Sequence, residues 1–224
     1  MLEYIFQKIS NSQKWTDLSR DICICMTNIF EYGNFSFNPN TKSFWDNRFS
    51  NVDKFWRNEH YYHILDIFSG SGKFSCLDIG CAIGDGCEIL QKEFLHAKIA
   101  GADISDIGIQ KAKQKTKHIE YYVLDILKDP IPTKYDYITI VQTLEHFDKP
   151  FFVVDKCLQY VNKSLIISVP YRQKASSSSL MNKSVHRCSF DEKSFINYKY
   201  KVVRVTDYIK STAAKCIIYE IFPE

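Results

Sequence analysis

The stretch that decides the fold of this chain is Leu77-Asp78-Ile79-Gly80-Cys81-Ala82-Ile83-Gly84-Asp85-Gly86. It begins as an apolar strand, continues as a tight turn with two glycines, and ends as the start of a helix. Glycine lets the backbone come close to a ligand, and the first turn of a helix presents N–H groups that have no partner within the helix. The stretch therefore predicts a ligand-binding turn between a strand and a helix.

Two phosphate-binding motifs with similar glycines are excluded. The dinucleotide fingerprint G-x-G-x-x-G requires glycine where Ala82 and Asp85 stand. Residues 70–73 read Gly-Ser-Gly-Lys and resemble a P-loop, but Ile67 replaces its first glycine and Phe74 its Ser or Thr. That segment also precedes a strand instead of following one. Neither motif explains the glycines.

Short apolar runs alternate with helical periodicity from residue 75 onward, which predicts a parallel sheet covered by helices on both faces. The predicted strands are 76–79, 98–102, 119–124, 135–141, 165–169, 201–205 and 216–222. The predicted helices are 85–94, 106–116, 151–161 and 190–198. We therefore expect an α/β fold with a seven-stranded, mostly parallel sheet, in which the last strand is antiparallel and pairs with the strand before it.

The N-terminal part of the chain differs from the rest. Residues 1–64 are rich in Phe, Trp, Tyr and Asn and lack strand alternation. We expect them to form a helical cover over one end of the sheet, ahead of a ligand-binding domain at 65–224. The connection at 171–185 contains a serine run and is much longer than the ~2–6 residues usual between strand and helix. A lid over the site and a surface loop without a role both fit it.

The composition excludes several classes of protein. Hydrophobic residues make up 45% and charged residues 25% of the 224 residues, as in globular chains. A net charge of +3 without a basic stripe does not favour a nucleic-acid partner. No apolar run approaches a membrane span, no signal peptide begins the chain, and the 8 cysteines include no Cys-x-x-Cys pair. We expect a cytoplasmic protein with reduced, mostly structural thiols and no membrane partner.

The pattern Asp-x-Gly-x-Ala-x-Gly from Asp78 to Gly84 resembles the first motif of class I S-adenosylmethionine-dependent methyltransferases, with Ala82 in place of the central glycine. Segments 100–105, 124–126, 135–147, 166–170 and 186–191 resemble later motifs in family order. The resemblance covers about residues 74–222 and, less specifically, Phe-Trp-Asp-Asn-Arg at 44–48. It implies a Rossmann-like fold, enzymatic methyl transfer, S-adenosylmethionine as cofactor and S-adenosylhomocysteine as product.

The resemblance also assigns roles to individual residues. Its cofactor-binding positions are Asp78, Gly80, Cys81, Ala82, Gly84, Asp103, Ile104, Asp125, Ile126 and Gln142. Asp103 stands 19 positions after Gly84, the spacing at which a carboxylate reaches a ribose diol, and Asp125 would meet the adenine amino group. His146, supported by Glu145, is the predicted general base. Tyr171 and His186 are predicted to line the substrate site.

Three hypotheses about the activity stay open. The first is methyl transfer to an oxygen or nitrogen of a small molecule such as a sugar, a phenol or an amine. The second is 2′-O-methylation of RNA, because small-RNA 3′-end methyltransferases carry Glu-x-x-Glu-His and a distant His around a metal ion. Here Gln142 replaces the first glutamate, so we expect no metal ion at Glu145, His146 and His186. The third is a non-catalytic binding protein of the same fold. No motif encodes the acceptor or the oligomeric state.

Overall fold

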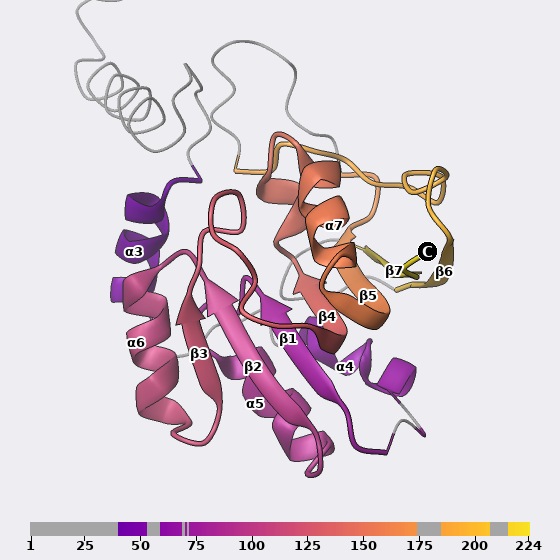
Figure 1. The fold of residues 1–224 in the computed structure, drawn as a ribbon. Coiled ribbons are helices and arrows are strands. Elements are labelled where there is room, and N and C mark those ends of the chain that lie inside the picture. The colour runs from indigo at the N-terminus through magenta and orange to yellow at the C-terminus, as the bar shows by residue number, and fades with distance from the viewer. Residues whose placement is uncertain (1–39, 53–58, 69, 71, 174–184, 207–214) are drawn as a thin grey trace, which may run out of the picture.

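A seven-stranded sheet runs through the structure, a computed structural model that describes residues 40–52, 59–68, 70, 72–173, 185–206 and 215–224. The strands lie in the order β3-β2-β1-β4-β5-β7-β6 (Figure 1). They are β1 (Ser75–Ile79), β2 (Lys98–Asp103), β3 (Glu120–Val123), β4 (Tyr135–Val141), β5 (Val161–Pro170), β6 (Tyr200–Val205) and β7 (Cys216–Ile221). Every predicted strand is therefore present.

The pairing of the strands matches the predicted sheet. β1 pairs in parallel with β2 and β4, and the pairs β2–β3 and β4–β5 are also parallel. β7 runs antiparallel to both of its neighbours, β5 and β6. This confirms a mostly parallel sheet with an antiparallel last strand. The strand order reverses between β1 and β4, and ligands of open α/β sheets bind at the carboxyl edge beside such a point.

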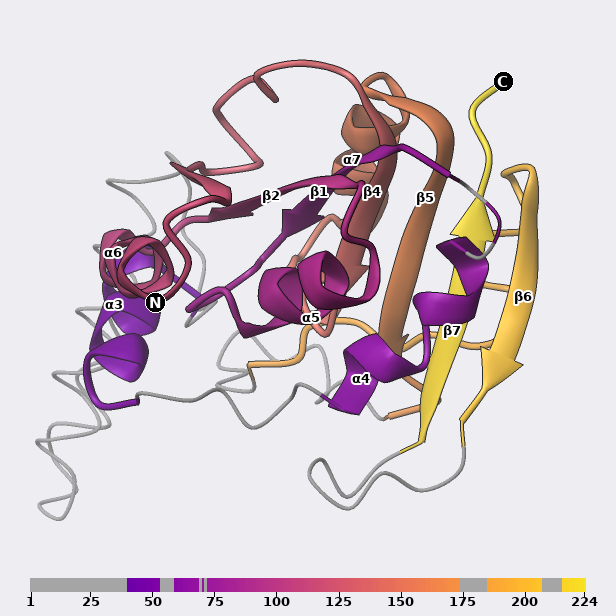
Figure 2. The ribbon, with the colours of Figure 1, turned by 90° about the horizontal axis from the view of Figure 1, so that it is seen from below.

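Helices cover both faces of the sheet. α3 (Lys42–Ser50), α4 (Glu59–Tyr62), α5 (Asp85–Glu93) and α6 (Asp106–Lys115) lie on one face, and α7 (Pro150–Leu158) lies on the other (Figure 2). Two short 3₁₀ helices, η1 (Leu65–Phe68) and η2 (Leu144–His146), complete the described elements. Each face has its own buried cluster, one around Leu90 and Ile109 and the other around Val154 and Phe195. Among the described residues, no helix combines the length and hydropathy needed to cross a membrane.

Helices α5 and α6 begin where β1 and β2 end, at the carboxyl edge of the sheet. α5 follows Gly84, whose φ of 85° turns the chain from strand to helix. α6 is capped by Ser105, whose hydroxyl oxygen accepts a hydrogen bond from Gly108 N at 3.0 Å. Both helices agree with the predicted ranges to within one residue. The two helix starts therefore bracket the predicted ligand-binding turn.

Two of the predicted helices need correction. The helix expected at 190–198 is wrong, because this segment forms consecutive turns with hydrogen bonds between residues three apart. Its Asp191 carboxylate accepts hydrogen bonds from Lys193 N and the Ser194 hydroxyl, which compete with helix formation. The helix expected at 151–161 ends at Leu158, since Val161 already belongs to β5.

The described part of the N-terminal region is helical, and its expected position as a cover over one end of the sheet stays a prediction. α3 lies beside α6 and α4 lies beside α5, so both extend the helical layer on one face (Figure 2). Residues 1–39 and 53–58, and residues 174–184 of the expected lid, lie outside the described residues. The six cysteines in the described ranges are free thiols.

Candidate active site

The glycine turn is held by the backbone of the neighbouring strand. Gly80 N and Cys81 N both donate to Ala102 O, at 2.8 and 3.1 Å. Gly80 has a φ of 78°, and a Cβ placed on it would lie 2.3 Å from Thr143 Oγ1. Ala82 also has a left-handed backbone, with a φ of 53°. The turn is therefore tightly folded and packs directly on Thr143, a residue that sequence analysis did not identify because only the folded chain brings it to Gly80.

Asp78 lies beneath this turn and is fully buried. Its Oδ2 accepts from the Tyr61 hydroxyl at 2.7 Å, and its Oδ1 accepts from the Thr139 hydroxyl at 2.7 Å. The Cys87 thiol lies 3.6 Å from Oδ2. Burial raises the pKa of Asp78 to about 6. Asp78 thus joins α4, β4 and α5 under the turn, and its part in cofactor binding stays a prediction.

Asp103 links the two turns that leave β1 and β2. Its Oδ2 accepts from Ala82 N and its Oδ1 accepts from Ser105 N, both at 2.9 Å. Burial raises the pKa of Asp103 to about 6. Each carboxylate oxygen has a second lone pair, so Asp103 is able to accept from two ribose hydroxyls as well. Ile104 continues the chain from this carboxylate toward α6.

The remaining predicted cofactor positions differ in orientation. Asp125 forms a local turn, accepting from Leu127 N at 3.0 Å, and pairs with Lys128 at 3.3 Å. Ile126 packs into the buried cluster on the α7 face. Gln142 has a φ of 52° and donates its side-chain amide to Ser168 O at 3.3 Å and to Cys216 Sγ at 3.4 Å. The Gln142 side chain therefore faces β5 and β7, and the next residue, Thr143, is the one that packs on Gly80.

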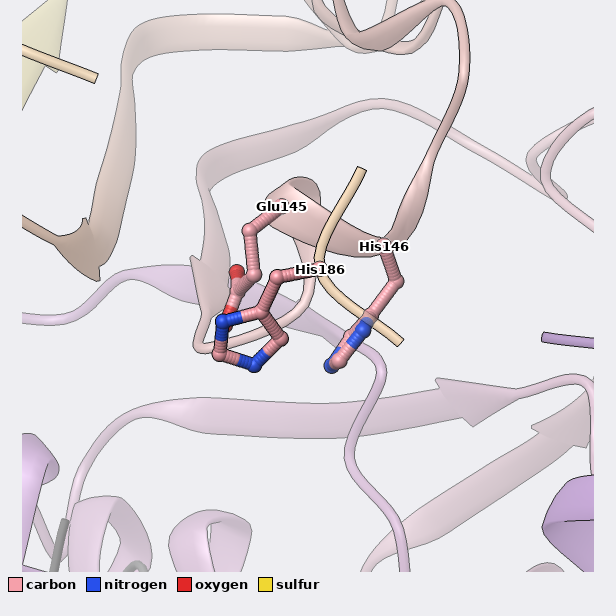
Figure 3. Close-up of side chains that lie close together, drawn as sticks. All are labelled: Glu145, His146 and His186. Carbon is pink, nitrogen blue, oxygen red and sulfur yellow. The ribbon is translucent and has the colours of Figure 1, made fainter. Parts of the chain in front are cut away.

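Glu145, His146 and His186 come together just beyond β4. Each offers one atom with a lone pair, a ring nitrogen or a carboxylate oxygen, and these three atoms lie within 4.8 Å of one another (Figure 3). Glu145 is 1% exposed and His146 6% exposed. Arg187 N donates to Glu145 O at 2.7 Å, which holds the His186 segment against η2. The predicted catalytic pair and the predicted substrate contact His186 thus form one polar cluster.

Tyr171 does not join this cluster. Its hydroxyl donates to Glu192, and the Arg172 guanidinium lies 5.0 Å from the centre of its ring. Its predicted contact with the substrate stays a prediction.

The orientation of the His146 ring is fixed by its neighbours. Nδ1 lies 2.7 Å from Val185 O, and because a carbonyl oxygen only accepts, Nδ1 is the donor. In the neutral ring Nε2 then carries the lone pair. The Trp45 ring lies edge-on to His146 at 5.1 Å, and the Asn40 amide donates to His146 O at 3.2 Å. Sequence analysis missed both contacts, although the 44–48 resemblance includes Trp45.

Comparison with known proteins agrees with this geometry. Residues 77–164 match a family model described as a methyltransferase domain. A ubiquinone biosynthesis O-methyltransferase of Nitrosomonas europaea is 27% identical over 105 residues, and the match spans 44% of this chain and 44% of that protein. Residues 77–164 are therefore similar to a methyltransferase domain.

Solved structures share the fold at low sequence identity. Magnesium protoporphyrin IX methyltransferase from Synechocystis, with bound S-adenosylhomocysteine, has a TM-score of 0.61 and 12% identity, covering 88% of this chain and 98% of that one. The N-methyltransferase NodS from Bradyrhizobium japonicum, also with S-adenosylhomocysteine, has a TM-score of 0.60 and 16% identity. The match covers 82% of this chain and 98% of that one. The names of these similar proteins differ in acceptor, so similarity alone assigns none to this chain.

Proposed function

We propose that this protein transfers the methyl group of S-adenosylmethionine to an oxygen or nitrogen atom of a small molecule. The observation that carries the proposal is the position of the cluster of Glu145, His146 and His186. It follows Thr143, the residue that packs on Gly80 in the predicted cofactor turn. Polar groups suited to an acceptor therefore lie beside the predicted donor site. The similar proteins named as O- and N-methyltransferases support this range of acceptors.

The reaction is a direct displacement. The acceptor atom attacks the sulfonium methyl carbon in line, the carbon–sulfur bond breaks with its electron pair left on sulfur, and S-adenosylhomocysteine leaves. Because the donor is already activated, the protein mainly positions the reactants and excludes water. A hydroxyl acceptor must also lose its proton, and we assign His146 Nε2 as the atom that accepts it, because His146 Nδ1 is bound to Val185 O.

RNA fits the described residues less well than a small molecule. The metal-assisted RNA site would need a carboxylate at position 142, whereas the Gln142 amide faces Ser168 and Cys216. The net charge of +3 without a basic stripe also offers little attraction for a phosphate backbone.

Calorimetry with S-adenosylhomocysteine tests the cofactor site. Asp103→Ala should weaken binding by ~1.5–3 kcal/mol, about 10- to 150-fold, because it removes a charged hydrogen-bond acceptor. Asp155→Ala, an exposed change on α7, is the matched control and should bind like the wild type. A wild-type protein that binds no S-adenosylhomocysteine would contradict the proposal.

The acceptor class is then tested by release of S-adenosylhomocysteine from S-adenosylmethionine. Phenols, sugars, amines and RNA 3′ ends are offered separately. Turnover with a small molecule supports the proposal, and turnover with RNA alone would replace it.

A further inference from the structure

We infer that Asn40 is a positioning residue that fixes the orientation of the His146 ring. The inference deepens the proposed function and rests on it only for the role of His146 as the base. Asn40 Nδ2 donates to two carbonyl oxygens, to Val185 O at 2.8 Å and to His146 O at 3.2 Å. Val185 O is also the atom that holds the His146 ring, through Nδ1 at 2.7 Å. One side chain therefore contacts both the backbone of the proposed base and the carbonyl that orients its ring.

The chemistry of the side-chain amide suits these contacts. Its nitrogen carries two N–H groups, so Asn40 is able to serve two carbonyl oxygens at once. A carbonyl oxygen has two lone pairs, which allows Val185 O to accept from Asn40 Nδ2 and from His146 Nδ1 together. Because this oxygen only accepts, Nδ1 carries the proton of the bond and the ring is held in one orientation. By holding the carbonyl of Val185 in place, Asn40 holds the ring.

Asn40 has a fixed place in the fold because it stands directly before the cap of α3. The cap is Thr41, which is 4% exposed and whose hydroxyl oxygen accepts from Phe44 N at 3.3 Å. One turn further along α3, Asp46 accepts from the Ser105 hydroxyl at 2.6 Å, at the start of α6. The chain that presents Asn40 is therefore anchored to the helix layer beside the predicted cofactor turn, which gives the amide a rigid base.

Two neighbouring rings also restrain the His146 ring. The ring of Trp45 and the ring of His186 each lie 5.1 Å from it, at interplanar angles of 68° and 70°. Figure 3 shows the His186 ring beside that of His146. Such edge-on contacts limit where the ring lies, whereas a hydrogen bond fixes the direction of one ring nitrogen. The bond to Val185 O, and hence Asn40, therefore sets the direction in which His146 faces an acceptor.

Nuclear magnetic resonance of the full chain with ¹⁵N-labelled histidine tests the inference. In the wild type the proton on His146 Nδ1 should be visible, because its hydrogen bond slows exchange with water, and His146→Gln identifies the signal by removing it. Asn40→Ala should broaden or abolish this signal. Asn51→Ala is the matched control, since Asn51 lies at the far end of α3 and its exposed amide donates to Asn47 O at 3.3 Å. The control should leave the Nδ1 signal unchanged.

A second variant separates positioning from a simple loss of packing. Asn40→Asp keeps the shape of the side chain but has no N–H group, so its oxygens would face the two carbonyl oxygens. It should disturb the Nδ1 signal at least as much as Asn40→Ala does, and urea unfolding checks that each variant is folded. The inference is overturned if the Nδ1 signal is unchanged in both Asn40 variants, or if Asn51→Ala disturbs it equally.

Binding and methyl transfer are measured on the same samples. Asn40→Ala should bind S-adenosylhomocysteine like the wild type. With a hydroxyl acceptor its kcat should fall ~2- to 10-fold, the equivalent of one lost hydrogen bond. A wild type that transfers no methyl group, while its Nδ1 signal still responds to Asn40→Ala, would contradict the proposed function alone. An active wild type whose Nδ1 signal ignores both Asn40 variants would overturn the positioning role alone.

Discussion

Residues with left-handed backbones concentrate at the candidate site. The non-glycine residues with positive φ in the described ranges are Ala82, Gln142 and Arg172, and the first two flank the contact between Gly80 and Thr143. Such conformations are strained for side chains with a Cβ and persist where the surrounding structure holds them. At Gly80 the requirement is stricter, because both the φ of 78° and the nearby Thr143 exclude a side chain.

Gly80→Ala therefore tests the packing of the turn. The left-handed backbone alone should lower the free energy of unfolding by ~1–2 kcal/mol, and the overlap with Thr143 should lower it by a further ~1–3 kcal/mol. Gly70→Ala is the matched control, because Gly70 has a φ of 77° with nothing within 4 Å of the added Cβ. Urea unfolding of both variants provides the comparison. Equal losses of unfolding free energy in the two variants would mean that Thr143 moves away from the added methyl group at no cost.

Among the elements, α3 is attached to α6 at its middle and at its C-terminal end. Asp46 Oδ1 accepts from the Ser105 hydroxyl at 2.6 Å and from Ile107 N at 3.3 Å. Farther along, Lys111 Nζ donates to Ser50 O at 3.1 Å and to Val52 O at 2.8 Å. Ser105 N in turn holds Asp103, so α3 supports the predicted ribose contact through one intermediate residue.

Asp46→Ala should loosen the start of α6. We expect a loss of ~1–2 kcal/mol in unfolding free energy, because charged hydrogen bonds exceed neutral ones. Amide hydrogen exchange at residues 105–108 should also become faster. Glu88→Ala removes an exposed ion pair with Lys92 (2.6 Å) on α5 and should lower stability by no more than ~0.5 kcal/mol. If exchange at 105–108 is unchanged in Asp46→Ala, α3 does not brace this turn.

The strands and the first two helices after the glycine turn could be predicted because hydrophobic periodicity reports burial directly. The segment 190–198 could not, since Asp191 directs local turns through side-chain bonds that compete with helix. At the site, His146 and Glu145 were predicted from their place after a strand. Their meeting with His186, and the turning of Gln142 toward Cys216, depend on long-range packing that no local pattern encodes.

Across the whole molecule, Asp78 is the point where separate layers meet. Tyr61 of α4, Thr139 of β4 and Cys87 of α5 all contact its carboxylate. Burial raises its pKa to about 6, above the ~3.9 of an unfolded chain. The stability that this group contributes is thus fully present below the unfolded value and is lost as the pH rises through about 6.

Asp78→Asn removes this titration while keeping the shape of the side chain. From about pH 5 to about pH 7 the wild type should lose ~1–1.5 kcal/mol of unfolding free energy relative to the variant. The pKa of Asp103 is also raised, but Asp103 is present in both proteins, so it does not affect the difference in unfolding free energy between them. Urea unfolding at several pH values measures it. Parallel pH profiles would show that Asp78 stays ionised in the folded protein.

The position of β7 inside the sheet has a consequence for how the protein is made. β7 (Cys216–Ile221) comes last among the strands but lies between β5 and β6 and is buried along its whole length. While the chain grows on a ribosome, β5 therefore has an open edge and β6 has no neighbouring strand until residues 216–221 emerge. An open edge is a template for pairing with another chain. Nascent chains that stall shortly before residue 216 should thus be the species most prone to aggregate during translation.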